Sequence, residues 1–179
     1  MWITLLVVLL ALLALGALAV LRPRLAKNAE LGDAPGMRST LVFQLAPGAG
    51  ALEGTDEDGG ASVPPPAVLD AIAASLETAG ADASHWTTLG GVLEMHGMLG
   101  ADTFKLTLGA LEGGAFLLVV HTRTLGRTRW VAPPATDAMR TVLFAVDRGI
   151  RAAPGVAGIV WRRRQDDVGA EGARPTPFD

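Results

Sequence analysis

The sequence predicts an α+β protein: a single N-terminal transmembrane helix followed by a two-layer domain, with two helices on one face of a mostly antiparallel sheet. Three observations lead to this prediction. Residues 2–21 form one uncharged apolar run. Residues 92–124 contain three alternating strand patterns joined by short glycine turns. Two stretches with apolar residues at helical spacing, 64–79 and 136–151, flank the three strands.

The apolar run predicts a membrane anchor. A helix rises about 1.5 Å per residue, so about 20 apolar residues cross the ~30 Å hydrocarbon core of a bilayer. The run lacks the polar stripe of a core helix and the leading basic segment of a signal peptide, although cleavage after Ala17-Leu18-Ala19 stays an alternative. Three basic residues follow the run directly. We therefore expect a single-pass signal anchor with the domain on the cytoplasmic side.

The rest of the chain divides into a linker, a domain and a tail. Residues 1–27 comprise the anchor and its basic flank, 28–38 a juxtamembrane linker, and 39–164 the α+β domain. Within the domain, residues 47–65 predict a mobile loop, because glycine, alanine, proline and acidic residues leave little to pack. We expect residues 165–179 to be a disordered tail.

The domain begins with a strand and a helix. Residues 39–46 are rich in β-branched and aromatic residues, which predicts a strand. Three prolines, tolerated in a first helical turn, open the helix at 64–79, and Gly80 ends it. Its apolar stripe comprises Val68, Leu69, Ile72 and Leu76.

Three strands then form a predicted meander over residues 92–98, 103–111 and 115–124. The turns place Met98 opposite Thr103 and Leu111 opposite Ala115. In this register one face is apolar and predicted to be buried, with Leu93, Met95, Phe104, Leu106, Leu108, Phe116, Leu118 and Val120. The other face is mainly polar, although three apolar residues also fall on it.

A second helix and a last strand complete the domain. Thr136 is a suitable N-cap for the helix, whose core stripe comprises Met139, Val142, Leu143, Val146 and Ile150. The last strand covers residues 156–162. The resulting order, β-α-β-β-β-α-β, predicts a ferredoxin-like variant with an added strand.

The charges are unevenly distributed along the chain. The formal net charge is −3, but residues 30–112 carry −10 (2 basic, 12 acidic) and residues 113–164 carry +7 (9 basic, 2 acidic). The two halves either neutralise each other in the fold or present separate faces to a partner.

The polar sheet face contains the best-defined candidate cluster of ligand-binding side chains. In the predicted register His96, Lys105 and His121 lie side by side, with Glu94 and Arg123 nearby. Cross-strand neighbours have Cβ atoms about 5 Å apart, so these groups could act on one ligand. A nearby ammonium favours neutral imidazole, which suits a general base or an anion pocket. The competing interpretation is an ordinary solvated sheet face.

The second helix predicts a separate binding face. Arg140, Phe144, Arg148 and Arg151 lie opposite its core stripe, and an outward phenylalanine among arginines suits a protein partner or anionic lipid. We do not expect nucleic acid to be a partner, since the chain is acidic and tethered. No nucleotide-binding, hydrolase or metalloprotease motif occurs. We expect no metal site and no cofactor.

The sequence thus favours a membrane-tethered, non-catalytic interaction domain. It would bind a protein partner or anionic lipid headgroups at the cytoplasmic surface of the membrane. The alternative is a small-ligand or hydrolytic site around His96, Lys105 and His121.

Overall fold

The computed structural model describes residues 33–46, 63–123, 130–164 and 172–179 of the chain. The predicted anchor and residues 47–62 of the predicted mobile loop lie outside these ranges. None of the helices formed by the described residues is long and apolar enough to cross a membrane. The described residues belong to one folded unit, which begins at Asp33.

These residues form an α+β domain with a mostly antiparallel sheet and two helices, as predicted. Its main elements are β1 (Thr40–Leu45), α2 (Pro66–Thr78), β4 (Val92–Leu99), β5 (Asp102–Ala110), β6 (Ala115–Arg123), α3 (Asp137–Ala152) and β7 (Val156–Arg162). Three short elements were not predicted: β2 (Asp82–Ala83), β3 (Thr87–Leu89) and the 3-10 helix η1 (Glu112–Gly114). The predicted order of the longer elements is confirmed.

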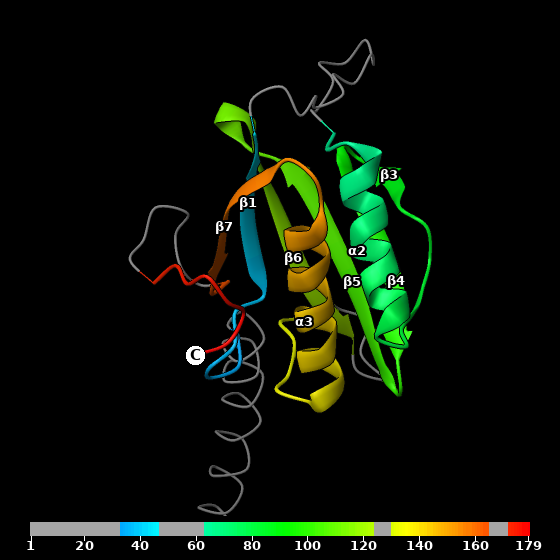
Figure 1. Ribbon diagram of the computed structural model, residues 1–179. Helices are drawn as coiled ribbons and strands as arrows, with labels where there is room; N and C mark the ends of the chain where they lie inside the picture. The colour runs from blue at the N-terminus through cyan, green and yellow to red at the C-terminus, as the bar shows by residue number, and fades with distance from the viewer. Residues whose placement is uncertain (1–32, 47–62, 124–129, 165–171) are drawn as a thin grey trace, which may run out of the picture. The chain divides into compact units, whose positions relative to one another are not determined.

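The sheet is built around the meander. Its strand order is β2-β4-β5-β6-β1-β7, with β3 also pairing with β4. Every strand pair in the described part of the chain is antiparallel. The first strand of the domain therefore lies between β6 and β7, and the helices α2 and α3 lie next to each other over one face (Figure 1). We call the opposite face the outer face.

The predicted register of the meander is confirmed. Met98 pairs with Thr103, and the Leu111 amide donates to the Ala115 carbonyl at 2.8 Å. The eight residues predicted to point inward are each at most 8% exposed. Burial of one such large side chain contributes about 1.5–3 kcal/mol, so the alternation of the three strands accounts for much of the core.

The two helices pack closely on each other and on the sheet. Thr136 caps α3 as predicted, its side chain accepting from the Met139 amide at 3.2 Å. Where the helices meet, a Cβ built on Gly149 would lie only 2.7 Å from the Ala71 carbonyl oxygen. Glycine at this position therefore lets α3 approach the backbone of α2.

The domain extends beyond its predicted boundaries at both ends. Residues 33–38, predicted as linker, and 172–179, predicted as disordered tail, both pack on the fold. Met37 is 1% exposed and forms an antiparallel bridge with Phe178. The Arg38 amide donates to the Pro177 carbonyl at 2.8 Å. Each segment is too short to show a period of its own, so sequence patterning could not reveal a pairing between them.

Candidate functional site

Strands β4, β5 and β6 bring three of the predicted ligand residues into one row on the outer face. His96 pairs with Lys105, and Lys105 pairs with His121. Their neighbours along the strands, such as Met95 and Leu106, are buried against the helices. Since successive strand residues point to opposite faces, the two histidines share the outer face, in agreement with the predicted register.

The central lysine of this row is already neutralised and covered. Lys105 Nζ donates to Glu94 Oε1 at 2.7 Å, and His96 Nε2 lies 3.5 Å from Glu94 Oε2. The hydrogen bond from Lys105 holds the pKa of Glu94 below its usual value. Trp130 lies over the pair: its ring centroid is 5.6 Å from Lys105 Nζ and 5.4 Å from the centroid of the His96 ring. Lys105 is therefore a satisfied cation and does not form an open anion site.

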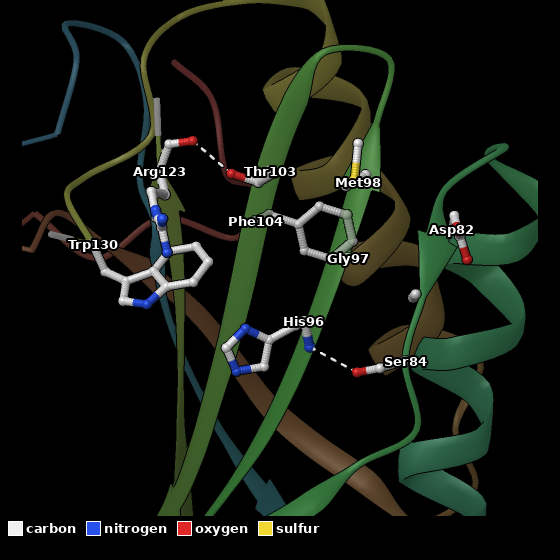
Figure 2. A pocket seen from close by; sticks show the side chains of 10 residues that line it. Asp82, Ser84, His96, Gly97, Met98, Thr103, Phe104, Arg123 and Trp130 are labelled. Carbon is white, nitrogen blue, oxygen red and sulfur yellow. Dashed lines mark hydrogen bonds between the residues drawn. The ribbon is translucent and has the colours of Figure 1, made fainter. Parts of the chain in front are cut away.

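A cavity of about 620 Å³ lies beside this row, on the outer face near the turn between β4 and β5. Figure 2 shows Trp130 and Arg123 on one side of it and Ser84 on the other, with His96 between them. The Ser84 hydroxyl accepts from the His96 amide at 3.0 Å and so fixes one rim. Of the five predicted ligand residues only His96 and Arg123 line this cavity, so the structure does not bring all five to one site.

A second hollow on the outer face, of about 330 Å³, lies over β1, β6 and β7. We call it the basic groove. Its floor is apolar, and three consecutive arginines form its rim. His121, from the row of His96, Lys105 and His121, also lines it. The lining residues are Thr40, Val42, Leu117, Val119, His121, Arg162, Arg163 and Arg164.

His121 Nδ1 and Arg164 Nε, which belong to the basic groove, are buried without a hydrogen-bond partner among the described residues. Burial, reinforced by the charges of Arg164 and Lys105, lowers the pKa of His121 to about 4, so this imidazole is neutral at pH 7. Burial also lowers the pKa of Arg164, which the charge of Asp33 partly offsets. An anion in the groove would supply the missing acceptor.

The predicted partner-binding residues lie on the outward side of α3, but each one contacts another part of the chain. Arg148 donates to Ser75 of α2, from Nε to the hydroxyl at 3.0 Å and from Nη2 to the carbonyl at 3.3 Å. Arg151 pairs with Asp147 at 2.9 Å and also donates to the Pro175 carbonyl.

The other two residues of that face hold a ring from the end of the chain. The rings of Phe144 and Phe178 have centroids 4.6 Å apart, and the Arg140 guanidinium carbon lies 5.3 Å from the centroid of the Phe178 ring. The chain itself therefore occupies part of the face that the sequence predicted for a partner.

Several residues that shape these sites were not singled out from the sequence. Trp130 has no local pattern that identifies it, although it lies against both Lys105 and His96. Phe178 was assigned to a disordered tail, although a phenylalanine preceded by Pro175 and Pro177 in an otherwise polar segment was a usable signal. In the described ranges no group of three or more His, Cys, Asp or Glu side chains is placed to hold a metal ion.

No protein-family model, curated protein or solved structure matches this chain. The ferredoxin-like arrangement therefore stays a prediction.

Proposed function

We propose that this chain is a non-catalytic binding domain, tethered by residues 2–21 to the cytoplasmic side of a membrane, and that its basic groove binds an anionic lipid headgroup. The observation that carries this proposal is the pair of unpartnered nitrogen atoms, His121 Nδ1 and Arg164 Nε, beside an apolar floor.

The polar side of the groove suits a phosphate group. A guanidinium matches phosphate geometry, and a hydrogen bond to a charged group contributes about 1.5–3 kcal/mol. A bound anion would favour the charged form of Arg164 and so oppose the effect of burial on its pKa. The neutral imidazole of His121 adds a hydrogen-bonding group without a second charge to desolvate.

The apolar side of the groove suits the lipid portion of the ligand. Val42, Leu117 and Val119 line the floor and are only partly buried, so an acyl chain would remove their remaining apolar surface from water. The predicted anchor supports the same ligand, because tethering raises the effective concentration of headgroups at the domain. An affinity that is modest in solution would then suffice.

The test uses the full-length chain in neutral detergent with soluble short-chain lipids. We expect dioctanoyl phosphatidylglycerol to raise the Tm with increasing concentration, and dioctanoyl phosphatidylcholine to leave it unchanged. Arg164→Gln should weaken phosphatidylglycerol binding about tenfold, which corresponds to ~1.4 kcal/mol. Arg123→Gln, on the same face but outside the groove, is the matched control and should bind like the wild type.

Two further results bear on this proposal. Inorganic phosphate alone should bind more weakly than phosphatidylglycerol, because it leaves the apolar floor exposed. Equal stabilisation by the two lipids, or equal binding by the wild type and Arg164→Gln, would refute the groove as a headgroup site.

The cavity beside His96 favours a second candidate function, the binding of a small ligand. Its volume of about 620 Å³ lies within the ~300–1,000 Å³ typical of ligand pockets. Trp130, His96 and Arg123 offer it an aromatic surface, an imidazole and a cation. In a thermal-shift screen of small anionic compounds, a true ligand should lose its effect in His96→Ala and keep it in Arg164→Gln. If the screen finds no compound with this behaviour, the cavity is not a ligand site.

A further inference from the structure

We propose that Arg140 and Phe144 of α3, together with Arg38 and Arg163, form a recognition surface for peptides in which an aromatic residue is followed directly by an acidic one. The chain's own residues 176–179, Thr-Pro-Phe-Asp, occupy it in cis. Arg163 also lines the basic groove, but the occupant of this surface, unlike the ligand of the groove, is seen in the structure. We call it the peptide face.

The aromatic position is recognised by stacking and by a cation. Phe178 lies against Phe144 with ring centroids 4.6 Å apart and planes at 45°, and Arg140 approaches the same ring at 5.3 Å. Aromatic pairs of this kind contribute beyond the apolar area that they bury, and a guanidinium near a ring adds electrostatic attraction. An aliphatic residue at this position would lose both effects.

The acidic position is recognised by two arginines from distant parts of the chain. Asp179 pairs with Arg38 through one carboxylate oxygen and with Arg163 through the other, the latter at 3.2 Å. Arg38 is only 3% exposed, so its charge is buried and benefits strongly from a carboxylate partner. The two arginines hold the pKa of Asp179 below its usual value, Arg38 most strongly through its hydrogen bond.

Backbone pairing sets the direction of the bound segment. The Arg38 amide donates to the Pro177 carbonyl at 2.8 Å, and the Asp179 amide donates to the Gly36 carbonyl at 3.2 Å. The segment thus runs antiparallel to residues 36–38, in the manner of a peptide added to the edge of a sheet. In this mode the backbone contributes affinity, and the side chains at Phe178 and Asp179 contribute specificity.

The cis segment leaves the surface only partly covered. Phe144 remains 58% exposed and the side chain of Asp179 remains 50% exposed. A segment held this way can exchange with a peptide of the same chemistry from a protein partner. Because the cis segment competes, the apparent affinity of an external peptide falls by the fraction of molecules whose site is open.

The test uses full-length chain and a fluorescein-labelled peptide of residues 172–179, with binding measured by fluorescence anisotropy. Phe178→Ala combined with Asp179→Asn empties the peptide face. We expect this double variant to bind the peptide at least about tenfold more tightly than the wild type does, because competition in cis is removed. Peptides carrying Phe178→Ala or Asp179→Asn should each bind more weakly than the unaltered peptide.

Two protein variants made in the background of the double variant locate the binding. Phe144→Ala should abolish peptide binding. Arg148→Ala, on the same side of α3 but bonded to Ser75, is the matched control and should leave binding unchanged. If the double variant fails to fold, as judged by circular dichroism, Asp179→Asn alone keeps the Phe178 ring and should still raise peptide affinity over the wild type. The proposal is overturned if the wild type and the double variant bind the labelled peptide equally, or if neither binds it. It is also overturned if the Phe178→Ala peptide binds as tightly as the unaltered peptide.

Discussion

Replacing Gly97 with alanine tests how closely strands β2, β4 and β5 approach one another. Gly97 pairs with Phe104 across the β4–β5 ladder, and the Phe104 ring fills the space where a side chain would be. A Cβ built on Gly97 would lie 2.3 Å from Phe104 Cζ and 2.9 Å from the Asp82 carbonyl oxygen in β2. Both distances are shorter than carbon contacts allow, so the ring or the neighbouring strand must move.

The cost follows from the burial of the ring. Phe104 is 0% exposed, so it has no free space into which to rotate. Overpacking a core costs about 1–3 kcal/mol, and the lower backbone entropy of alanine in the unfolded chain offsets about 0.4–1 kcal/mol of that. We expect a net loss of about 1–2 kcal/mol. In a domain of this size each 1 kcal/mol lowers the Tm by about 2–4 °C, so the Tm should fall by about 2–8 °C.

Thermal melts followed by circular dichroism measure this effect, and the chain offers a matched control. Gly109 also lies in a strand of the meander, but a Cβ there would meet Val92 Cγ1 at 3.4 Å, an ordinary contact. Gly109→Ala should therefore leave the Tm unchanged or raise it slightly.

A double-mutant cycle completes the test. Phe104→Leu should cost less in the Gly97→Ala background than in the wild type, because the smaller side chain relieves the clash, with a coupling of about 0.5–3 kcal/mol. The reasoning fails if Gly97→Ala and Gly109→Ala have the same Tm. It also fails if Phe104→Leu lowers the free energy of unfolding equally in both backgrounds.

Two further predictions concern acid and helix packing. The pKa of His121 is about 4 in the folded chain and about 6.5 in an unfolded one. As the pH falls from 6.5 to 4, the unfolded chain therefore binds a proton that the folded chain does not. The free energy of unfolding should drop by up to about 3 kcal/mol over that range, and denaturant titrations of His121→Gln should lack this part of the drop. Gly149→Ala would place a Cβ 2.7 Å from the Ala71 carbonyl oxygen; it should lower stability by about 1–3 kcal/mol in the same melts, although alanine is the better helix former. A Tm at or above the wild-type value would contradict this packing argument.

Local patterns were sufficient to predict the central part of the fold. The turns between β4, β5 and β6 are short, so the alternation of apolar residues determines both the register and the buried face. The same holds for α3, whose N-cap Thr136 and core stripe, Met139 to Ile150, are visible in one continuous stretch of sequence. By contrast, β2 and β3 have no apolar alternation to reveal them; they form because the edge of β4 offers them partners.

The candidate sites were harder to predict because contacts between distant residues decide them. The outward direction of Arg148 follows from helical spacing, but its bond to Ser75 joins residues 73 positions apart. Arg38 and Asp179 are separated by 141 positions, and neither has a local pattern that points to the other. Similarly, the row of His96, Lys105 and His121 was predicted, but the cover that Trp130 provides was not.

The isolated bridge between residues 36–38 and 177–179 has a consequence for truncation of the chain. It lies directly after Asp33, where the folded unit begins, and its antiparallel hydrogen bonds join the two ends of the described chain. Asp33 itself accepts from the Ser39 amide and from the Arg164 amide, so the start of the unit is also held beside β1 and β7. Removing residues 177–179 would therefore take away the backbone partners of Gly36 and Arg38 while leaving these contacts and the strand pairs of the sheet in place.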